Sequence, residues 1–275
     1  MTKQHACGRV LSPGIALSFT LSFALSCGAG CGGSNGPGWV QLFNGVDLTG
    51  WQAKISHYPV GENYANTFRV KNGVIQVSYD DYDATGFGGN EGKFGLLYWT
   101  TPLSKFRLRV EYRFTGPQAP NPPAWGLRNS GLMVFGEDPA GVGVDVIYPS
   151  ILEIQLLGRD NTGNTNNGNL CPLGGSSAML NGIRVMDGCT GSTSLPFAAN
   201  PNFADDAWVT VEAEVHGSGD TKVTFAGDNN DRPVLVFSQP MAMMGGPLLD
   251  RGFIALQSES HPIEFRKVEM MELKE

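Results

Sequence analysis

The sequence predicts a single all-β domain, either a β-sandwich or a jelly roll. Roughly a dozen short apolar runs that alternate with polar residues follow Trp39, turn residues separate them, and none has sustained helical periodicity. The composition agrees, because 37 glycines and 17 prolines with only 16% charged residues favour many turns over long helices. We find no internal repeat and no linker inside this region, so one domain of about 240 residues is expected.

The first 31 residues have the pattern of a secretion signal. Lys3 and Arg9 supply a positive n-region, and the apolar run from Ile15 through Leu25 is too short to span a membrane. Two cysteines follow this run, Cys27 and Cys31, and each lies in a sequence similar to a bacterial lipoprotein processing site. An ordinary signal peptide that is cleaved nearby is the alternative.

The cysteine count favours Cys31 over Cys27 as the lipidated residue. If Cys31 is modified, the mature chain keeps only Cys171 and Cys189, which can pair, whereas modification of Cys27 leaves an odd thiol. Export permits a Cys171–Cys189 disulfide. We therefore expect a monomeric, exported protein, either periplasmic or an outer-membrane or cell-surface lipoprotein, with a lipid anchor as its only membrane contact.

After a glycine-rich tether at residues 32–38, the folded domain is predicted to span residues 39–275. Asn72-Gly73 supplies the positive φ values of a tight turn and predicts a hairpin over Phe68–Ser78. In contrast, residues Arg159–Ser177 are predicted to form a long polar loop. The other predicted strands lie within Val40–Phe43, Gly95–Trp99, Phe106–Phe114, Trp125–Phe135, Ile151–Leu157, Trp208–His216, Lys222–Ala226, Val234–Phe237, Gly252–Gln257 and Ile263–Leu273.

The strand Ile151–Leu157 is the one most informative about function. Its alternation places Leu152, Ile154 and Leu156 on one face and Glu153 and Gln155 on the other. A carboxylate and an amide on an otherwise apolar strand suggest that the second face is a concave wall. The alternative is that Glu153 is a solvated residue of a half-exposed sheet.

Charge and motifs argue against several function classes. The net charge is −7 and the body of the chain has no basic cluster, so nucleic acid is not an expected partner. The sequence has no Gly-rich phosphate loop, CxxC pair or HExxH motif, and no GxSxG motif follows Trp39. Asp80, Asp81 and Asp83 lie close together, but the rest of a calcium-binding EF-hand loop is missing, so the metal content is left undetermined.

The remaining candidates for chemistry are polar residues at the starts or on the faces of strands. Such a set offers several hydrogen-bonding groups and at least two acid–base groups, which suits a polyhydroxylated ligand. Gln257, Glu259 and His261 share one side only if their strand continues that far, and Pro262 makes this uncertain. The candidate residues are Arg128, Asn129, Ser130, Glu153, Gln155, Gln257, Glu259 and His261.

Five segments resemble, in order, the motifs of the 3-keto-disaccharide hydrolase family. They are Leu42–Trp51, Phe68–Val74, Arg128–Gly131, Glu153–Leu157 and Leu256–Arg266, and the resemblance extends over about Trp39 to Leu273. The resemblance implies a concanavalin-like (laminin-G-like) jelly roll that acts on 3-keto-glycosides, in an exported bacterial protein that is often a lipoprotein. One departure is Leu96, where some relatives have a histidine, so a catalytic or metal-binding role for that position is not expected here.

The resemblance leads to a hypothesis of C2 deprotonation, elimination of the aglycone from C1 and hydration. Glu153 is assigned as the base, with His261 as the second choice, and Arg128 as the group that polarises the ketone. A divalent cation is the alternative to Arg128. Asn129, Ser130, Gln155, Gln257 and Glu259 are assigned to substrate binding.

Two other readings compete with the enzyme. The first is a non-catalytic carbohydrate-binding module, which predicts aromatic platforms such as Trp99, Trp125 or Trp208 in the groove. The second is a purely structural surface lipoprotein.

Overall fold

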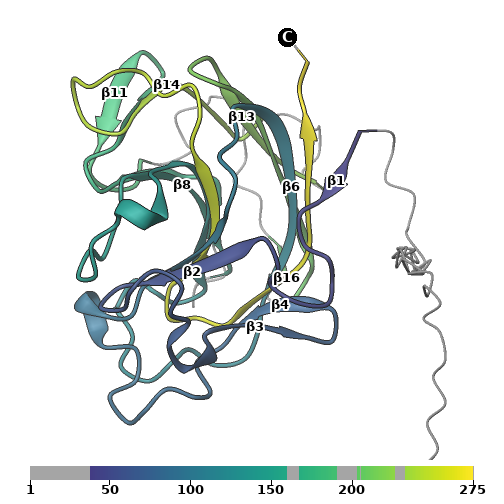
Figure 1. The fold of residues 1–275 in the computed structure, drawn as a ribbon, viewed down its shortest axis with the longest axis vertical. Helices are drawn as coiled ribbons and strands as arrows, with labels where there is room; N and C mark the ends of the chain where they lie inside the picture. Colours follow the sequence, from purple (N-terminus) through teal and green to yellow (C-terminus); the bar gives the residue numbers. More distant parts are fainter. Residues whose placement is uncertain (1–37, 160–166, 191–202, 205, 227–232, 275) are drawn as a thin grey trace, which may run out of the picture. The chain divides into compact units, whose positions relative to one another are not determined.

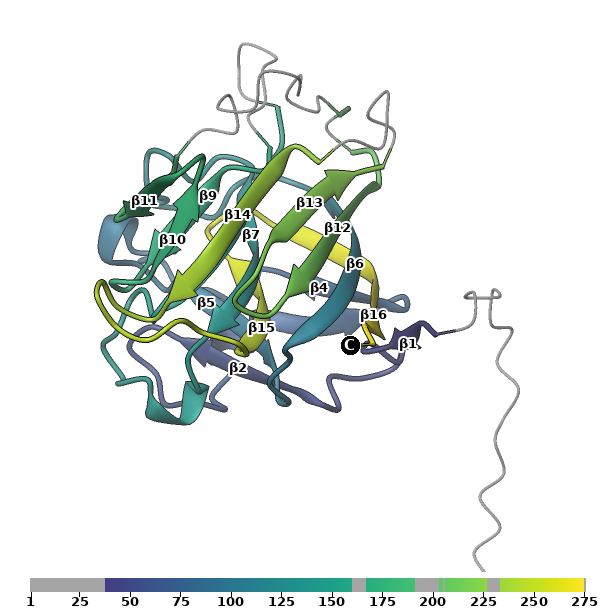
Figure 2. The ribbon, with the colours of Figure 1, turned by 90° about the horizontal axis from the view of Figure 1, so that it is seen from above.

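Two antiparallel sheets face each other across a shared apolar core, in agreement with the predicted β-sandwich (Figures 1 and 2). The computed structural model describes residues 38–159, 167–190, 203–204, 206–226 and 233–274. The predicted signal segment, most of the tether, and both Cys27 and Cys31 lie outside these residues. No helix of the described residues is long and apolar enough to cross a membrane.

The larger sheet has ten strands. In spatial order these are β11 (Ile183–Met186), β10 (Ser177–Leu180), β14 (Leu235–Met241), β13 (Thr221–Phe225), β12 (Val209–His216), β6 (Lys105–Phe114), β16 (Ile263–Glu272), β4 (Val74–Val77) and β3 (Phe68–Lys71), with β1 (Val40–Gln41) also paired to β16.

The smaller sheet has six strands and carries the candidate site. In spatial order these are β2 (Trp51–Ile55), β5 (Gly95–Trp99), β15 (Phe253–Ser258), β7 (Asn129–Gly136), β8 (Ile151–Leu157) and β9 (Leu170–Leu173). The helical segments of the described residues are three short 3-10 turns, at Tyr64–Asn66, Gly89–Glu91 and Pro139–Gly141.

Strand β6 confirms the predicted alternation. Its apolar residues, such as Leu108 and Val110, are fully buried between the sheets, whereas its arginines lie on the outer face. There Arg109 contacts Glu212 at 2.9 Å and Glu269 at 3.0 Å, on the two neighbouring strands. The outer face of β6 and its two neighbouring strands therefore carries paired charges.

Strand β8 lies near the edge of the smaller sheet and divides its side chains as predicted. Leu152, Ile154 and Leu156 are buried in the shared core. Glu153 and Gln155 point to the opposite face of the sheet, away from that core. The hairpin of β3 and β4 is also confirmed, and Asn72 and Gly73 at its turn have φ values of 54° and 76°.

The prediction of one long loop over Arg159–Ser177 is wrong in part. Residues Leu170–Leu173 form the edge strand β9, which pairs with β8 so that Cys171 lies opposite Glu153. Pro172 has no N–H to donate, which an edge strand tolerates because one of its sides needs no partner. The predicted Cys171–Cys189 disulfide is present and ties β9 to the segment that follows β11.

Candidate active site

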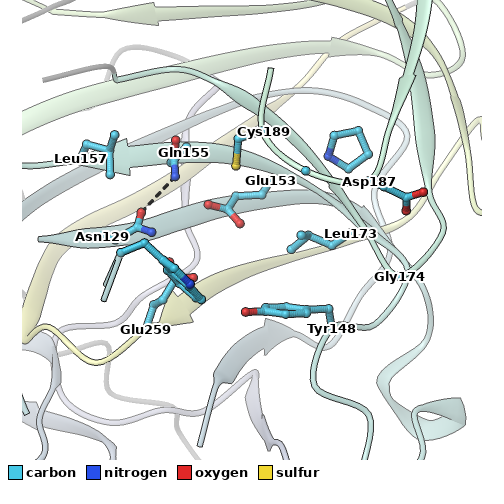
Figure 3. A pocket seen from close by; sticks show the side chains of 13 residues that line it. Asn129, Tyr148, Glu153, Gln155, Leu157, Leu173, Gly174, Asp187, Cys189 and Glu259 are labelled. Carbon is cyan, nitrogen blue, oxygen red and sulfur yellow. Dashed lines mark hydrogen bonds between the residues drawn. The ribbon is translucent and has the colours of Figure 1, made fainter. Parts of the chain in front are cut away.

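A cavity of about 630 Å³ lies on the face of the smaller sheet that is turned away from the core (Figure 3). Strands β7, β8 and β9, the segment after β15 and the residues before β8 all contribute to its wall. Its lining includes Asn129, Tyr148, Glu153, Gln155, Leu173 and Glu259. Four of the eight residues predicted to form the site, namely Asn129, Glu153, Gln155 and Glu259, therefore line one cavity.

Glu153 lies in the centre of this wall, with only 3% of its surface exposed. Its carboxylate accepts a hydrogen bond of 3.3 Å from the amide Nε2 of Gln257 on β15. Burial raises the pKa of Glu153 far above the ordinary value, and the hydrogen bond from Gln257 lowers it only in part. Glu153 is therefore a buried carboxyl group and not a solvated strand residue.

Gly131 provides the space that Glu153 occupies. It lies on β7 directly opposite Gln155. Met133, two residues further along β7 and on the same face, lies opposite Glu153. A Cβ atom at Gly131 would come within 2.6 Å of Glu153 Cγ and 2.8 Å of Met133 Cε. The glycine of the Asn129-Ser130-Gly131 motif is thus needed for the position of the carboxylate, a role that the sequence analysis did not assign.

Glu259 follows β15 directly and is the second buried carboxyl group of the cavity, with 4% exposure. Its Oε2 is buried without a hydrogen-bond partner among the described residues. Burial raises its pKa well above the ordinary value, and the nearby charge of Glu153 raises it further. The two carboxyl groups are therefore coupled, and ionisation of one opposes ionisation of the other.

The backbone around Glu259 is held in place by Tyr79. The phenol oxygen accepts a hydrogen bond of 2.9 Å from the N–H of Ser260 and lies 3.0 Å from Ser258 Oγ. Ser260 has a φ of 77°, an uncommon conformation for a residue with a side chain. This anchored turn ends the alternation of β15 and directs Glu259 into the cavity.

A chain of amides forms one side of the cavity. Asn169 Nδ2 donates to Gln155 Oε1 at 2.7 Å, and Gln155 Nε2 donates to Asn129 Oδ1 at 3.3 Å (Figure 3). Because the carbonyl of Asn129 accepts from Gln155, its amide N–H groups are donors at the cavity wall. Such fixed donors and acceptors suit sugar hydroxyls. Asn169 was not among the predicted residues, because it lies in the segment expected to be a loop.

Tyr148 lies across the cavity from these strands and was also not predicted. Burial raises the pKa of its phenol, and the charges of Glu259 and Glu153 raise it further, so the hydroxyl keeps its proton at neutral pH. Its ring packs against Phe94, with ring centres 5.2 Å apart. The irregular segment before β8 gave no periodic signal that pointed to this residue.

Arg128 and His261 do not line this cavity, which corrects the expectation that they share it with Glu153. Both line a separate cavity of about 340 Å³ together with Arg113 and Asp206. The predicted continuation of β15 fails at Ser260, and Arg128 precedes β7 with a φ of 46°. Burial and then the charge of Arg128 lower the pKa of His261 to about 4, so its imidazole is neutral at pH 7.

Ser130 and Gln257 take supporting positions. Ser130 is fully buried and its hydroxyl donates to the carbonyl of Gln257 at 3.1 Å, which joins β7 to β15. Gln257 contacts the cavity indirectly, through its hydrogen bond to Glu153. Leu96 lies directly opposite Gln257 on β5 and packs in an apolar cluster on the cavity face of the sheet.

Among the described residues that line the cavity, Glu153, Glu259 and Asp187 carry carboxyl groups. Among the described residues, no group of three or more His, Cys, Asp or Glu side chains is arranged to hold a metal ion. A divalent cation in this cavity would find Glu153 and Glu259. Asp80 and Asp81 are instead within 3.4 Å of Arg69, as surface ion pairs.

Solved structures with the same fold include carbohydrate-related proteins. A proposed glycosyl hydrolase of Parabacteroides distasonis ATCC 8503 is 16% identical, with a TM-score of 0.51 over 86% of this chain and 94% of that one. A second one from the same organism is 14% identical, with a TM-score of 0.42 over 86% and 99% of the two chains. The Bacillus subtilis carbohydrate-binding module CBM66 is 12% identical, with a TM-score of 0.38 over 66% and 88%.

The two facing sheets and the likeness to the first of these structures define the class of the protein as a β-sandwich of the jelly-roll type. The family is given by the sequence itself. The model of the 3-keto-alpha-glucoside-1,2-lyase-like domain matches residues 38–271, so the chain belongs to this carbohydrate-active family, as the resemblance of its motifs implied. A search of the curated proteins finds no match.

We expect Gly131→Ala to disturb the site, because its Cβ would come within 2.6 Å of Glu153 Cγ. Overpacking of this kind costs about 1–3 kcal/mol, so the free energy of unfolding should fall by that amount in urea titrations. Gly141→Ala is the matched control, because nothing lies within 4 Å of its added Cβ. Equal stability of the two variants would contradict the packing argument.

We expect Glu259→Gln to stabilise the fold at alkaline pH. The raised pKa means that the native state binds the Glu259 proton more tightly than the unfolded chain does. Native stability therefore falls as pH rises from the ordinary carboxyl pKa through the raised one, and glutamine removes this loss. At pH 9 the variant should be at least about 1 kcal/mol more stable than the native protein, with a smaller difference at pH 5.

Thermal unfolding at pH 5, 7 and 9 measures this effect. The exposed Glu62→Gln is the control for loss of a carboxylate at the surface. A stability difference for Glu259→Gln that does not grow with pH would show that its carboxyl group is not held protonated by burial.

Proposed function

We propose that this protein cleaves 3-keto-glycosides in the Glu153 cavity. The observation that carries the proposal is the pair of buried, coupled carboxyl groups, Glu153 and Glu259, beside a wall of fixed amides. The cavity volume of about 630 Å³ is in the range of small-molecule sites, about 300–1,000 Å³. Membership of the 3-keto-alpha-glucoside-1,2-lyase-like family supports the choice of substrate.

The chemistry begins at C2 of the 3-keto sugar. The neighbouring ketone acidifies the C2 proton, because the negative charge that forms on its removal is shared with the ketone oxygen. Collapse of this enolate breaks the C1–O bond, forms a C1=C2 double bond and releases the aglycone, which takes up a proton. Water then adds across the double bond, with hydroxyl at C1 and hydrogen at C2, and the net result is hydrolysis.

Two coupled carboxyl groups supply two different roles. Because the charges repel, one group ionises while the other keeps its proton, and the pKa of Glu153, raised to about 8, brings this state in as the pH rises toward that value. Ionised Glu153 removes the C2 proton, and its raised pKa makes it a stronger base than an ordinary carboxylate. Protonated Glu259 donates a hydrogen bond to the ketone oxygen, where charge develops. Glu259 thus replaces Arg128, which lies in the other cavity.

The amides hold the sugar ring in register with this base. Asn129 and Gln155 are fixed by their mutual hydrogen bond and offer donors and acceptors to the ring hydroxyls. Tyr148 lines the same cavity, and its protonated hydroxyl can hydrogen-bond the sugar. Fixed partners reduce the entropy lost on reaching the reactive geometry.

The positions of the tryptophans argue against a binding module with aromatic platforms. Trp99 packs edge-on against Trp51 at 5.4 Å, and Trp208 lies between the guanidinium groups of Arg113 and Arg266, at 4.6 and 4.4 Å. Of the three predicted platforms, only Trp125 lines the cavity. A single exposed tryptophan is a small stacking surface for a module that binds sugar without turnover.

Glu153→Gln tests the assignment of the base. We expect it to lower kcat/KM on a methyl 3-keto-glucoside by roughly 10²–10⁴-fold, because glutamine cannot accept the proton. The assay measures aglycone release, with the exposed Glu91→Gln as the matched control. Full activity of Glu153→Gln would contradict the assignment, and binding without turnover by the native protein would favour the binding module.

The same assay with EDTA tests the alternative electrophile. Turnover that survives EDTA fits a proton donated by Glu259. Turnover that EDTA abolishes and a divalent cation restores would assign the polarising role to a metal ion.

We also infer that the chain is exported and lipidated at Cys31. The Cys171–Cys189 disulfide supports an oxidising compartment. Expression of the full chain in a bacterial host with radiolabelled palmitate should label the native protein and Cys27→Ser, but not Cys31→Ser. Loss of label only in Cys27→Ser would assign the lipid to Cys27, and no label in any of the three would contradict the anchor.

A further inference from the structure

The cavity wall has a polar stretch at Gln155 and Glu153 on β8 and an apolar stretch at Pro172 and Leu173 on β9. On its cavity face β8 presents, in order, Leu157, Gln155, Glu153 and Ile151. The first three line the cavity, and Ile151 is fully buried beside Leu173, its partner on β9. Successive residues on one face of a strand are about 6.6 Å apart. The amides therefore lie on one side of Glu153 and an apolar region on the other, as Figure 3 shows for Asn129 and Leu173.

The apolar region is a packed cluster and not a few isolated side chains. Its buried members are Leu96, Tyr98, Met133, Ile151 and Ala255, on four neighbouring strands, and Leu173 and Phe253 pack against them. Leu173 is partly exposed and lines the cavity together with Pro172 and the ring of Tyr148. The carboxylate of Asp187 also lines this cavity but is exposed to solvent.

Proton removal by Glu153 fixes which part of the substrate meets this region. The base must contact C2, so the bonded carbon C1 and its leaving group lie directly beside it. The ring hydroxyls need the amides on the Gln155 side. The leaving group is therefore directed to the other side, between Leu173 and Tyr148.

A second sugar would fit this region poorly. Each hydroxyl group that loses water there without gaining a partner costs about 1–3 kcal/mol. An apolar group of the same size instead gains about 25 cal/mol for each Å² removed from water. Both effects favour an apolar leaving group.

We propose that the region bounded by Leu173, Pro172 and Tyr148 is an aglycone subsite for an apolar alcohol. The natural substrate is then the 3-keto-glucoside of an aryl or alkyl alcohol, and a 3-keto-disaccharide is a poorer one. This inference rests on the proposed function, because it uses the position of the base.

Three substrates test it with the native protein. They share one 3-keto-glucosyl group and one anomeric configuration, and their aglycones are methanol, benzyl alcohol and glucose. Benzyl alkoxide is a poorer leaving group than a sugar alkoxide, so a preference for the benzyl compound has to come from binding. We expect its kcat/KM to exceed that of the disaccharide by about tenfold or more.

Leu173→Asn should shift this preference toward the disaccharide by about tenfold, because asparagine gives a polar wall of similar size. Leu173→Met keeps an apolar wall and should keep the native ratio. Leu248→Asn is the control for the chemical change alone, because Leu248 is an exposed leucine outside the cavity. Melting temperatures establish that each variant is folded.

The outcomes separate the two proposals. Turnover of the methyl compound with a preference for the disaccharide would overturn the aglycone subsite and leave the proposed function in place. An unchanged benzyl-to-disaccharide ratio in folded Leu173→Asn would do the same. No turnover of any compound would overturn the proposed function. Calorimetric affinities of Glu153→Gln for the benzyl and glucosyl compounds then still test the subsite, and tighter binding of the glucosyl compound overturns it.

Discussion

Two carboxyl groups of the cavity, those of Glu153 and Glu259, are held out of water, and among the described residues neither forms an ion pair with a lysine or an arginine. Elsewhere in the described residues a buried glutamate is neutralised: Glu269, with 1% exposure, lies 3.0 Å from an arginine. Glu153 has only the weak donor Gln257, and one oxygen of Glu259 has no partner among the described residues. An arrangement of this kind lowers stability above the ordinary carboxyl pKa, and sites that tune acids and bases commonly contain it. The anchoring of β8 and of the turn at Ser260 holds both groups in place against that cost.

The two sheets have different outer faces. The larger sheet turns a ladder of arginine and glutamate pairs to solvent, so its outer face is closed by side chains that satisfy each other. The strands of the smaller sheet carry two charged residues, Lys54 and Glu153, and Glu153 lines the cavity together with Glu259, which follows β15. Because the same core stabilises both sheets, the larger one contributes stability that compensates for the unpaired carboxyl groups of the smaller one.

Much of the fold and part of the site were predictable from sequence. Period-two alternation located β6 and β8, and Asn72-Gly73 located the hairpin, because these signals are local. The alternation of β8 also placed Glu153 and Gln155 on the face opposite the core. What local patterns do not contain is where a strand stops. The left-handed turn at Ser260 depends on Tyr79, a residue 181 positions away along the chain, and this turn separates His261 from Glu259. Tyr148 and Asn169 were not predicted because both lie in irregular segments, and only the tertiary fold brings these segments to the cavity.

Gly131 makes the size of the side chain at position 153 depend on the size of the side chain at position 131. The carboxylate of Glu153 occupies volume that exists only because the neighbouring strand lacks a side chain at that point. A larger residue at position 131 is compatible with an acid at position 153 only if that acid is shorter, and an aspartate would withdraw its carboxyl group toward the sheet by one methylene. A larger side chain at position 131 therefore requires a shorter acid at position 153, whose carboxyl group extends less far into the cavity. The side chains allowed at the two positions therefore limit each other, and the depth at which the acid meets its ligand depends on the strand that does not carry it.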